Sequence, residues 1–230
     1  MSGLFSKQKA QRPHLVRGTG GIAGEIADLR NDIEDELGVL AAVAVEEFID
    51  PPASAVDAIV VALAPDDTQA VSLSGAALDG TIGAAEMDPP RNLTFDTLGA
   101  TPADVPATAD VVGTDVNNQP LLETVTLSQI VGQAVGVKAF KTVVSIDYPI
   151  ADGTDATVSV GIGEQFGLAK TIKSRAGLAD LTREIEAGSI VTTGTIVDAA
   201  TSEPNGTYEP ATVADAANDY AIYYEWDPTA

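Results

Sequence analysis

The stretch VVGTDVNNQPLLETVTL, residues 111–127, has the pattern of two β-strands joined by a tight turn. The pair Asn117-Asn118 falls where a two-residue turn is expected, and asparagine adopts the positive φ of such turns more readily than most residues. After the turn, two faces alternate, with Leu122, Thr124 and Thr126 on one and Leu121, Glu123, Val125 and Leu127 on the other. This period-two pattern predicts a β-hairpin with one buried face.

Similar runs recur from Pro51 to the C-terminus. RNLTFDTLG (91–99) places Leu93 and Phe95 on one face and polar residues on the other, as in a half-buried strand. The other strand-like runs are AIVVALA (58–64), QAVSLSG (69–75), KAFKTVVSI (138–146), TVSVGI (157–162), SIVTTGTIV (189–197) and AIYYEW (221–226). LADLTREIEAG (178–188) fits either a helix or an edge strand. We therefore expect a mainly β fold, with an antiparallel β-sandwich or barrel-like body over residues 51–230, built as one or two sandwich-like subdomains.

The N-terminal segment has a different pattern. Residues 1–21 combine proline, glycine and spaced cations without periodicity, which predicts an extended basic arm that becomes ordered against a partner. Residues 22–50 are expected to form one amphipathic helix, which ends at Gly38 or continues to about Phe48 before Pro51. Its apolar stripe has helical spacing and consists of Ile22, Ile26, Leu29, Ile33, Leu37 and Leu40. This stripe is expected to pack on the body or on a sister subunit rather than to form a coiled coil.

Charge is distributed unevenly along the chain. Residues 1–24 contain four basic residues, Lys7, Lys9, Arg12 and Arg17, and no acidic one. The remaining residues contain eight basic against 34 acidic side chains, a net charge of −26. An acidic body repels nucleic acid and anionic membranes, so neither is an expected partner. The basic arm suggests attachment to an acidic surface, and a basic tail without a partner is the alternative.

Composition and motifs offer little for catalysis or for cofactors. The chain has no cysteine, and its one histidine, His14, lies in the arm, so thiol chemistry and a Ser–His–Asp triad are not expected. The cations of the arm are not followed by the apolar segment of an export signal, and the longest apolar run, LGVLAAVAV (37–45), is too short to span a bilayer. A hydrolase based on paired carboxylates remains an alternative, because acidic residues are abundant. We expect no catalytic, cofactor or metal site.

Three weaker patterns have plain structural explanations. The glycines at 161, 163 and 167 nearly match a dinucleotide-binding loop, but their β surroundings favour a glycine-rich strand end. Asp115, Asn117 and Glu123, like the turn at 152–155, faintly resemble calcium ligands but lack the spacing of an EF-hand. Tyr220, Ile222, Tyr224 and Trp226 share one face of a strand and are expected in a core or a subunit contact, with sugar binding as the alternative.

Four segments carry a resemblance to a known class of proteins. PPRNLTF (89–95), VVGTDVNNQPLLETVTL (111–127), GVKAFKTVVSI (136–146) and VSVGIGEQFGL (158–168) resemble, in order and spacing, a pattern typical of bacteriophage virion proteins. These are mainly head decoration, or capsid cement, proteins and related structural components. The resemblance covers residues 88–168 and departs from the pattern at Asn118, where glycine is more usual.

The resemblance implies a non-enzymatic structural protein without cofactors. It would be made in the host cytoplasm and would bind the outside of the assembled head, where it stabilises the lattice of the major capsid protein. The family also implies a homo-oligomer, with a trimer as one form. We expect Lys7, Lys9, Arg12 and Arg17 to contact acidic groups of the major capsid protein. A phage tail, fibre or baseplate component that binds a glycan receptor is the alternative.

Overall fold

The structure is a computed structural model, and it describes residues 42–152, 156–171, 183–186, 189–191, 194–197 and 206–226. The chain divides into two compact units at Ala41/Ala42, and every described residue belongs to the second. The expected basic arm, its four cations and the stripe from Ile22 to Leu40 therefore lie outside the described residues. No helix among the described residues combines the length and the apolar character that crossing a bilayer requires.

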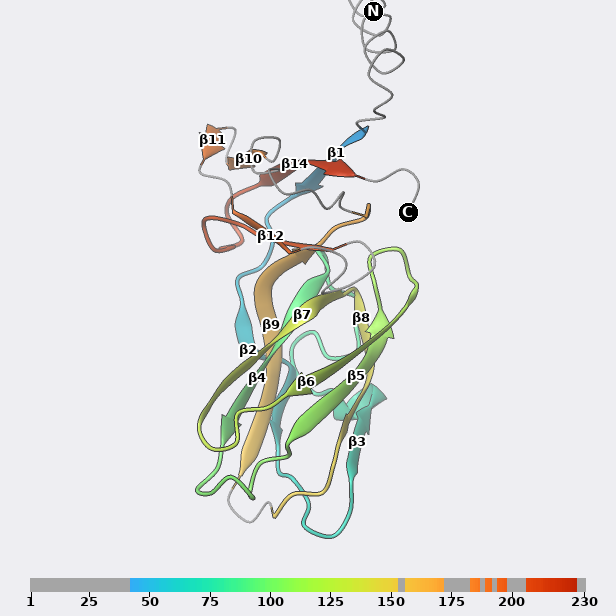
Figure 1. Ribbon diagram of the computed structural model, residues 1–230, viewed down its shortest axis with the longest axis vertical. Coiled ribbons are helices and arrows are strands. Elements are labelled where there is room, and N and C mark those ends of the chain that lie inside the picture. The colour runs from blue at the N-terminus through green and yellow to red at the C-terminus, as the bar shows by residue number, and fades with distance from the viewer. Residues whose placement is uncertain are drawn as a thin grey trace, which may run out of the picture. The chain divides into compact units, whose positions relative to one another are not determined.

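Two antiparallel sheets form a β-sandwich (Figure 1). The first, called here the β9 sheet, contains β2 (Ala55–Leu63), β4 (Arg91–Leu98), β7 (Gly132–Phe140) and β9 (Thr157–Gly167), with β4 and β2 pairing with β9. The second, the β5 sheet, has the order β3 (Val71–Ser74), β8 (Thr142–Tyr148), β5 (Thr108–Thr114) and β6 (Pro120–Thr126). The predicted mainly β, antiparallel sandwich is confirmed.

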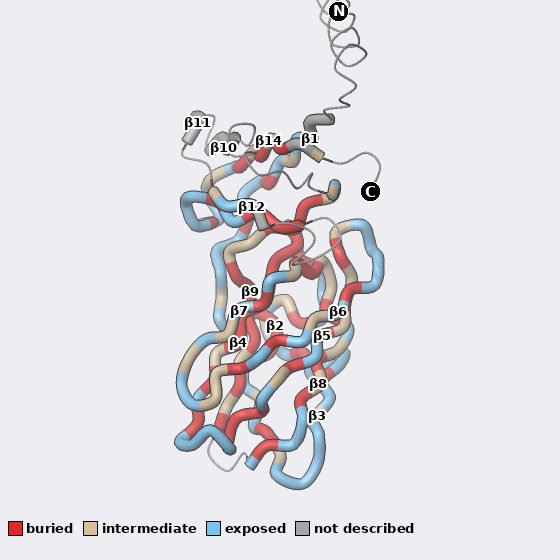
Figure 2. Tube along the Cα trace, in the orientation of Figure 1, coloured by how far each residue is buried: buried red, intermediate tan, exposed pale blue. Residues whose placement is uncertain are grey.

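The first core lies between these sheets. It includes Leu93 and Phe95 of β4, both fully buried, together with Val111 of β5 and Val125 of β6. Each such side chain contributes about 1.5–3 kcal/mol to stability when it is fully buried. Buried positions are concentrated along β4 and β9 in Figure 2. Strand β4 lies between β7 and β9, which makes it a central strand.

The hairpin of β5 and β6 forms where the sequence predicts it, and its alternation holds, since Leu121 and Val125 are buried while Leu122 is exposed. The connection is longer than the expected two-residue turn. Asp115 N donates to Gln119 O at 2.9 Å, and Asn118 N donates to Asp115 O at 3.0 Å. Asn118 has φ +60°, so the loop is a turn followed by a left-handed residue. The positive φ therefore falls on Asn118, the second residue of the predicted turn, within a longer loop.

A second core lies at the far end of β9. There β1 (Ala42–Phe48) pairs with β14 (Tyr220–Trp226), which also pairs with β10 (Arg183–Glu186), and β11 (Ser189–Val191) follows at the edge. The short strands β12 (Thr195–Val197) and β13 (Thr207–Glu209) extend the β9 sheet. Phe166 of β9 contacts Phe48 at a ring-centroid distance of 4.6 Å and Tyr220 at 5.9 Å. One continuous strand thus contributes Val160 to the first core and Phe166 to the second.

Several expectations about local structure need correction. Residues 42–48, placed in the helix predicted for 22–50, form strand β1 instead, because their backbone pairs with β14 from Ala42↔Trp226 to Phe48↔Tyr220. In a strand, alternate side chains point to opposite faces, so Phe48 is buried in the second core while Val45 and Glu47 are exposed. A helix would place Val45 and Phe48 on the same face. KAFKTVVSI is divided between β7 and β8, which lie in different sheets, and SIVTTGTIV between β11 and β12. In the segment 178–188, the described residues 183–186 are a strand.

Candidate functional site

Strand β4 is flanked on both sides by irregular pairing at the same level. Along β4 the register advances by two residues while it advances by four along each neighbouring strand. On β9 the pairs are Arg91–Phe166 and Leu93–Ile162. On β7 they are Asn92–Ala139 and Thr94–Val135. Each neighbour therefore bulges away from β4, and its extra backbone groups need partners from elsewhere. The side chains that supply these partners make up the candidate site.

Asn92 provides partners on both sides of β4. Its Oδ1 accepts a hydrogen bond from Gln165 N at 2.9 Å, and its Nδ2 donates to Gly136 O at 2.8 Å. A carboxamide is suited to this position because it carries both acceptor and donors. The bulge also requires Gly163, since a Cβ atom there would lie 2.5 Å from Asn92 Oδ1.

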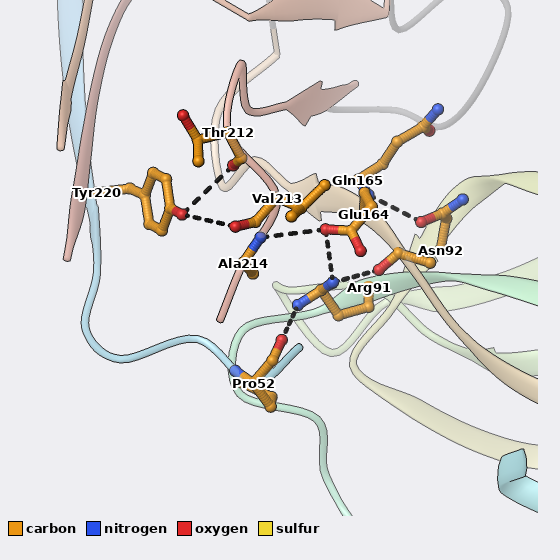
Figure 3. Close-up of polar contacts among 10 residues, drawn as sticks. Pro52, Arg91, Asn92, Glu164, Gln165, Thr212, Val213, Ala214 and Tyr220 are labelled. Atoms are coloured by element: carbon orange, nitrogen blue, oxygen red, sulfur yellow. Dashed lines mark hydrogen bonds and ion pairs between the residues drawn. The ribbon is translucent and has the colours of Figure 1, made fainter. Parts of the chain in front are cut away.

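Arg91 is completely buried and binds the main chain (Figure 3). Its Nε donates to Gly163 O at 2.7 Å, its Nη2 donates to the same oxygen, and its Nη1 donates to Pro52 O at 2.8 Å. The guanidinium carbon lies 4.8 Å from the ring centroid of Phe166. Burial lowers the pKa of Arg91 to about 10, although nearby Glu164 and Tyr220 raise it. Arg91 is therefore still a cation at neutral pH, and its charge is matched inside the protein.

Glu164 connects this cation to the segment that leads into β14. Its Oε2 lies 3.6 Å from Arg91 Nη2 and accepts a hydrogen bond from Ala214 N at 3.2 Å. Close by, Tyr220 Oη donates to the carbonyl oxygens of Thr212 and Val213, at 3.3 and 3.2 Å. The polar network thus joins the two cores (Figure 3).

Two further carboxylates are engaged by backbone amides. Glu123 of β6 accepts from Val137 N at 2.7 Å and from Lys138 N at 3.4 Å, so it serves the bulge of β7 from the opposite sheet. Burial raises the pKa of Glu123, and the hydrogen bonds only partly oppose this shift. Asp115 accepts from Asn117 N and Gln119 N, both at 2.8 Å, inside its own loop. These contacts account for both acids of the faint calcium pattern.

The described ranges contain no group of three acidic or histidine side chains that could hold a metal ion. Of the turn at 152–155, only Asp152 lies in those ranges. The glycine-rich run is part of β9, as expected for a strand rather than for a dinucleotide loop. Gly161 is needed because a Cβ atom there would lie 1.8 Å from Ala55 O.

The aromatic face of β14 belongs mainly to the second core. Tyr220, Ile222 and Tyr224 are fully buried, as the sequence predicts, and Trp226 is partly buried with Lys170 Nζ 5.3 Å from its ring centroid. Tyr224 Oη donates to Glu46 Oε1, which also accepts from Ala169 N at 2.6 Å.

This second network also perturbs two titrating groups. Burial raises the pKa of Glu46, and burial together with the Glu46 charge raises the pKa of Tyr224. The phenol therefore remains protonated and can donate to Glu46 across the neutral pH range.

A pocket of about 240 Å³ opens on the outer face of the β9 sheet beside the bulges. Its lining includes Ser54, Thr94, Gln133, Val135, Glu164 and Glu209. Sequence patterns alone did not single out these residues or Arg91. One signal was available, because Arg91 is the only basic residue between positions 31 and 137 and lies in a strand-like run. A lone cation in such a run indicates a buried partner.

Comparison with known proteins adds no relative: no family model, no curated protein and no solved structure matches the chain. By its fold, the protein is an antiparallel β-sandwich. It has a second, aromatic core, which β9 and the Arg91 network connect to the core of the sandwich.

Proposed function

We propose that the chain is a non-enzymatic structural protein of a bacteriophage virion, a decoration or cement protein on the outside of the capsid. The observation that carries this proposal is the charge segregation. Four cations and no acid lie in residues 1–24, against a net charge of −26 in the remainder. The resemblance of residues 88–168 to phage virion proteins supports the assignment independently.

The organisation of the body is consistent with a scaffold role. Arg91, Asn92, Glu123 and Asp115 direct their hydrogen bonds to main-chain atoms, so these polar side chains maintain an irregular sheet. A cysteine-free sandwich needs no particular redox environment to persist. The acidic surface keeps neighbouring particles apart by mutual repulsion.

In the proposed mechanism, Lys7, Lys9, Arg12 and Arg17 bind acidic groups on the major capsid protein. An arm of this kind orders along the shell and adds contact area that a compact face cannot supply. The stripe from Ile22 to Leu40 packs on the body or on a sister subunit. The result is a homo-oligomer, such as a trimer, at a symmetry point of the shell.

Deletion of residues 2–20 tests the role of the arm. The truncated protein should remain folded and soluble but should no longer co-sediment with capsids. Two matched variants test whether the charge of the arm is required. Replacing all four cations with glutamine should abolish capsid binding. Replacing each lysine with arginine and each arginine with lysine keeps the charge and should preserve capsid binding. Undiminished binding by the truncated protein would refute the proposed attachment.

A tail, fibre or baseplate protein with glycan binding is the second candidate. The observation that favours it is Trp226, which is only partly buried at the end of the aromatic face. This candidate expects glycan binding that disappears in Trp226→Ala while the fold is retained. Immunogold labelling of intact particles separates the two candidates directly, since one expects label on the head and the other on the tail.

A further inference from the structure

The pocket beside the bulges has walls of different character. On one side the segment Ser54–Val56 crosses the outer face of β9 so closely that Gly161 has no room for a Cβ atom. Val56 and Val135, which are 54% and 51% exposed, provide apolar surface at the pocket. The floor is formed by the bulged part of β9 and by Thr94 of β4. The pocket therefore offers apolar walls above a polar floor.

Thr94 has an unusual environment for a polar side chain. Only 6% of the residue is exposed, yet its hydroxyl makes no hydrogen bond with any residue that the structure describes. Among the described residues, the buried side-chain polar atom without a hydrogen-bond partner is Tyr148 Oη, so the Thr94 hydroxyl is reached by the solvent of the pocket. A ligand in the pocket can replace that solvent as the hydrogen-bond partner of Thr94.

The other polar groups of the pocket mainly accept hydrogen bonds. Glu209 is exposed, and Glu164 uses one carboxylate oxygen, Oε2, for Arg91 and Ala214, which leaves Oε1 available. Gln133 donates its side-chain amide to Asp96, so its carbonyl oxygen is left as an acceptor. The described residues that line the pocket include no lysine, arginine or histidine. Ser54 and Gln165 Nε2 can donate as well, but the two carboxylates favour a ligand that donates several hydrogen bonds and carries positive charge.

An arginine side chain has this combination of properties. Its guanidinium presents five N–H donors and no acceptor, and it remains charged under all ordinary conditions. Its methylene stem can lie along apolar surface while the head reaches polar partners, here the valines and the floor of the pocket. An anion is disfavoured by the carboxylates and by the net charge of −22.

We propose that this pocket binds an arginine side chain of a partner polypeptide. The guanidinium contacts Glu209 and the free oxygen of Glu164, and one of its N–H groups donates to the Thr94 hydroxyl. This inference goes beyond the proposed function, because it assigns the acidic body a binding site of its own that does not involve the basic arm.

The test uses the full-length protein and Nα-acetyl-arginine-amide as the probe, with NMR chemical-shift titration as the readout. We expect saturable shifts centred on Thr94 and Gln165. The matched citrulline amide, which has nearly the same shape but no charge, should bind at least about tenfold more weakly, since charged hydrogen bonds are the stronger ones. The lysine amide should fall between the two.

Three variants locate the binding. Thr94→Val, which keeps the shape but removes the hydroxyl, and Glu209→Gln, which removes an exposed charge, should each weaken arginine binding by about five- to tenfold. Glu47→Gln, an equivalent exposed change on β1, should leave the affinity unaltered. Circular dichroism checks that each variant folds, and the exposed position of Glu209 keeps the test decisive even if Thr94→Val is unstable.

Equal binding of the citrulline and arginine probes, or an unaltered affinity in Glu209→Gln, would overturn the proposal. Shifts at the pocket with neutral monosaccharides but not with the arginine probe would also overturn it and would favour a sugar site. None of these outcomes depends on capsids, so the pocket and the capsid attachment fail or succeed separately.

Discussion

Arg91 Nη2 and Glu164 Oε2 lie 3.6 Å apart at the junction of the two cores, and Arg91 has no exposed surface. Removal of the cation should therefore be costly, because it leaves Glu164 without its opposite charge and the carbonyl oxygens of Gly163 and Pro52 without the Arg91 donors. We expect Arg91→Met to lower the free energy of unfolding by about 3–5 kcal/mol, as for other broken buried ion pairs. Urea denaturation measures this directly. Lys170→Met, a change at an exposed lysine, is the control and should cost about 1 kcal/mol or less.

Asn92 should be needed to satisfy both bulges. Asn92→Ala leaves Gln165 N and Gly136 O without their partners, and each orphaned buried group costs about 1–3 kcal/mol. We expect a loss of about 2–5 kcal/mol of stability and faster hydrogen exchange at the Gln165 amide. Asn117→Ala, in the exposed hairpin loop, serves as the control. Unchanged protection of the Gln165 amide in Asn92→Ala would contradict the role of Asn92 as its acceptor.

The pH dependence of stability should reflect Glu123 and Glu46. Their pKa values are raised in the folded state, mainly by burial, above the ordinary value of 4.5. The folded state therefore holds protons that the unfolded state has released, and the stabilisation is complete below pH 4.5 and is lost as the pH rises through the folded-state pKa values. Glu123→Gln should flatten this decline while keeping an acceptor for Val137 N.

The opposite trend belongs to Asp66 and Asp104. Hydrogen bonds from Thr68 and Thr101 lower their pKa values below the ordinary 3.8, so their contribution is present above pH 3.8 and is lost as the pH falls. Thermal unfolding of the wild type and of Glu123→Gln between pH 3 and 8 separates the two trends, with Glu47→Gln as an exposed control. If the stability of Glu123→Gln fell with pH above 4.5 as steeply as that of the wild type, Glu123 would not be the source of the decline.

Salt should stabilise the folded protein. The net charge of −22 produces self-repulsion in the compact state, and salt screens it, since the Debye length falls from about 10 Å at 0.1 M to about 3 Å at 1 M. We expect a gain of about 1 kcal/mol or more between these concentrations, which is a rise of about 2–4 °C in Tm. Sucrose at equal osmolality is the control for solvent exclusion. A Tm that responds equally to sucrose and to NaCl would exclude charge screening as the cause.

The sequence predicts the parts of the fold that depend on local patterns. The β5–β6 hairpin and the buried tyrosines of β14 follow from alternation and turn residues. The alternation of β4 is misleading, because its polar face, with Asn92 and Thr94, is covered as well. The alternation of side chains along β4 does not reveal that its polar face is buried. That burial comes from the bulges of β7 and β9 and from residues 54–56.

Long-range pairing is the other limit on what the sequence predicts. Strand β1 is stabilised by β14, and Phe48 pairs with Tyr220 across most of the chain. An alanine- and valine-rich segment next to a helical pattern gives no local sign of such a partner. The candidate site has the same origin, because Arg91, Glu164 and Glu209 come together only when β4, β9 and β13 are placed in register.

The passage of β9 through both cores has a consequence for how the body comes apart. Val160 and Phe166 belong to one continuous strand, so unfolding of either core removes packing partners from the other. The body should therefore lose its structure in a single calorimetric step, with equal calorimetric and van't Hoff enthalpies. A protease would then find no half-folded species to cleave.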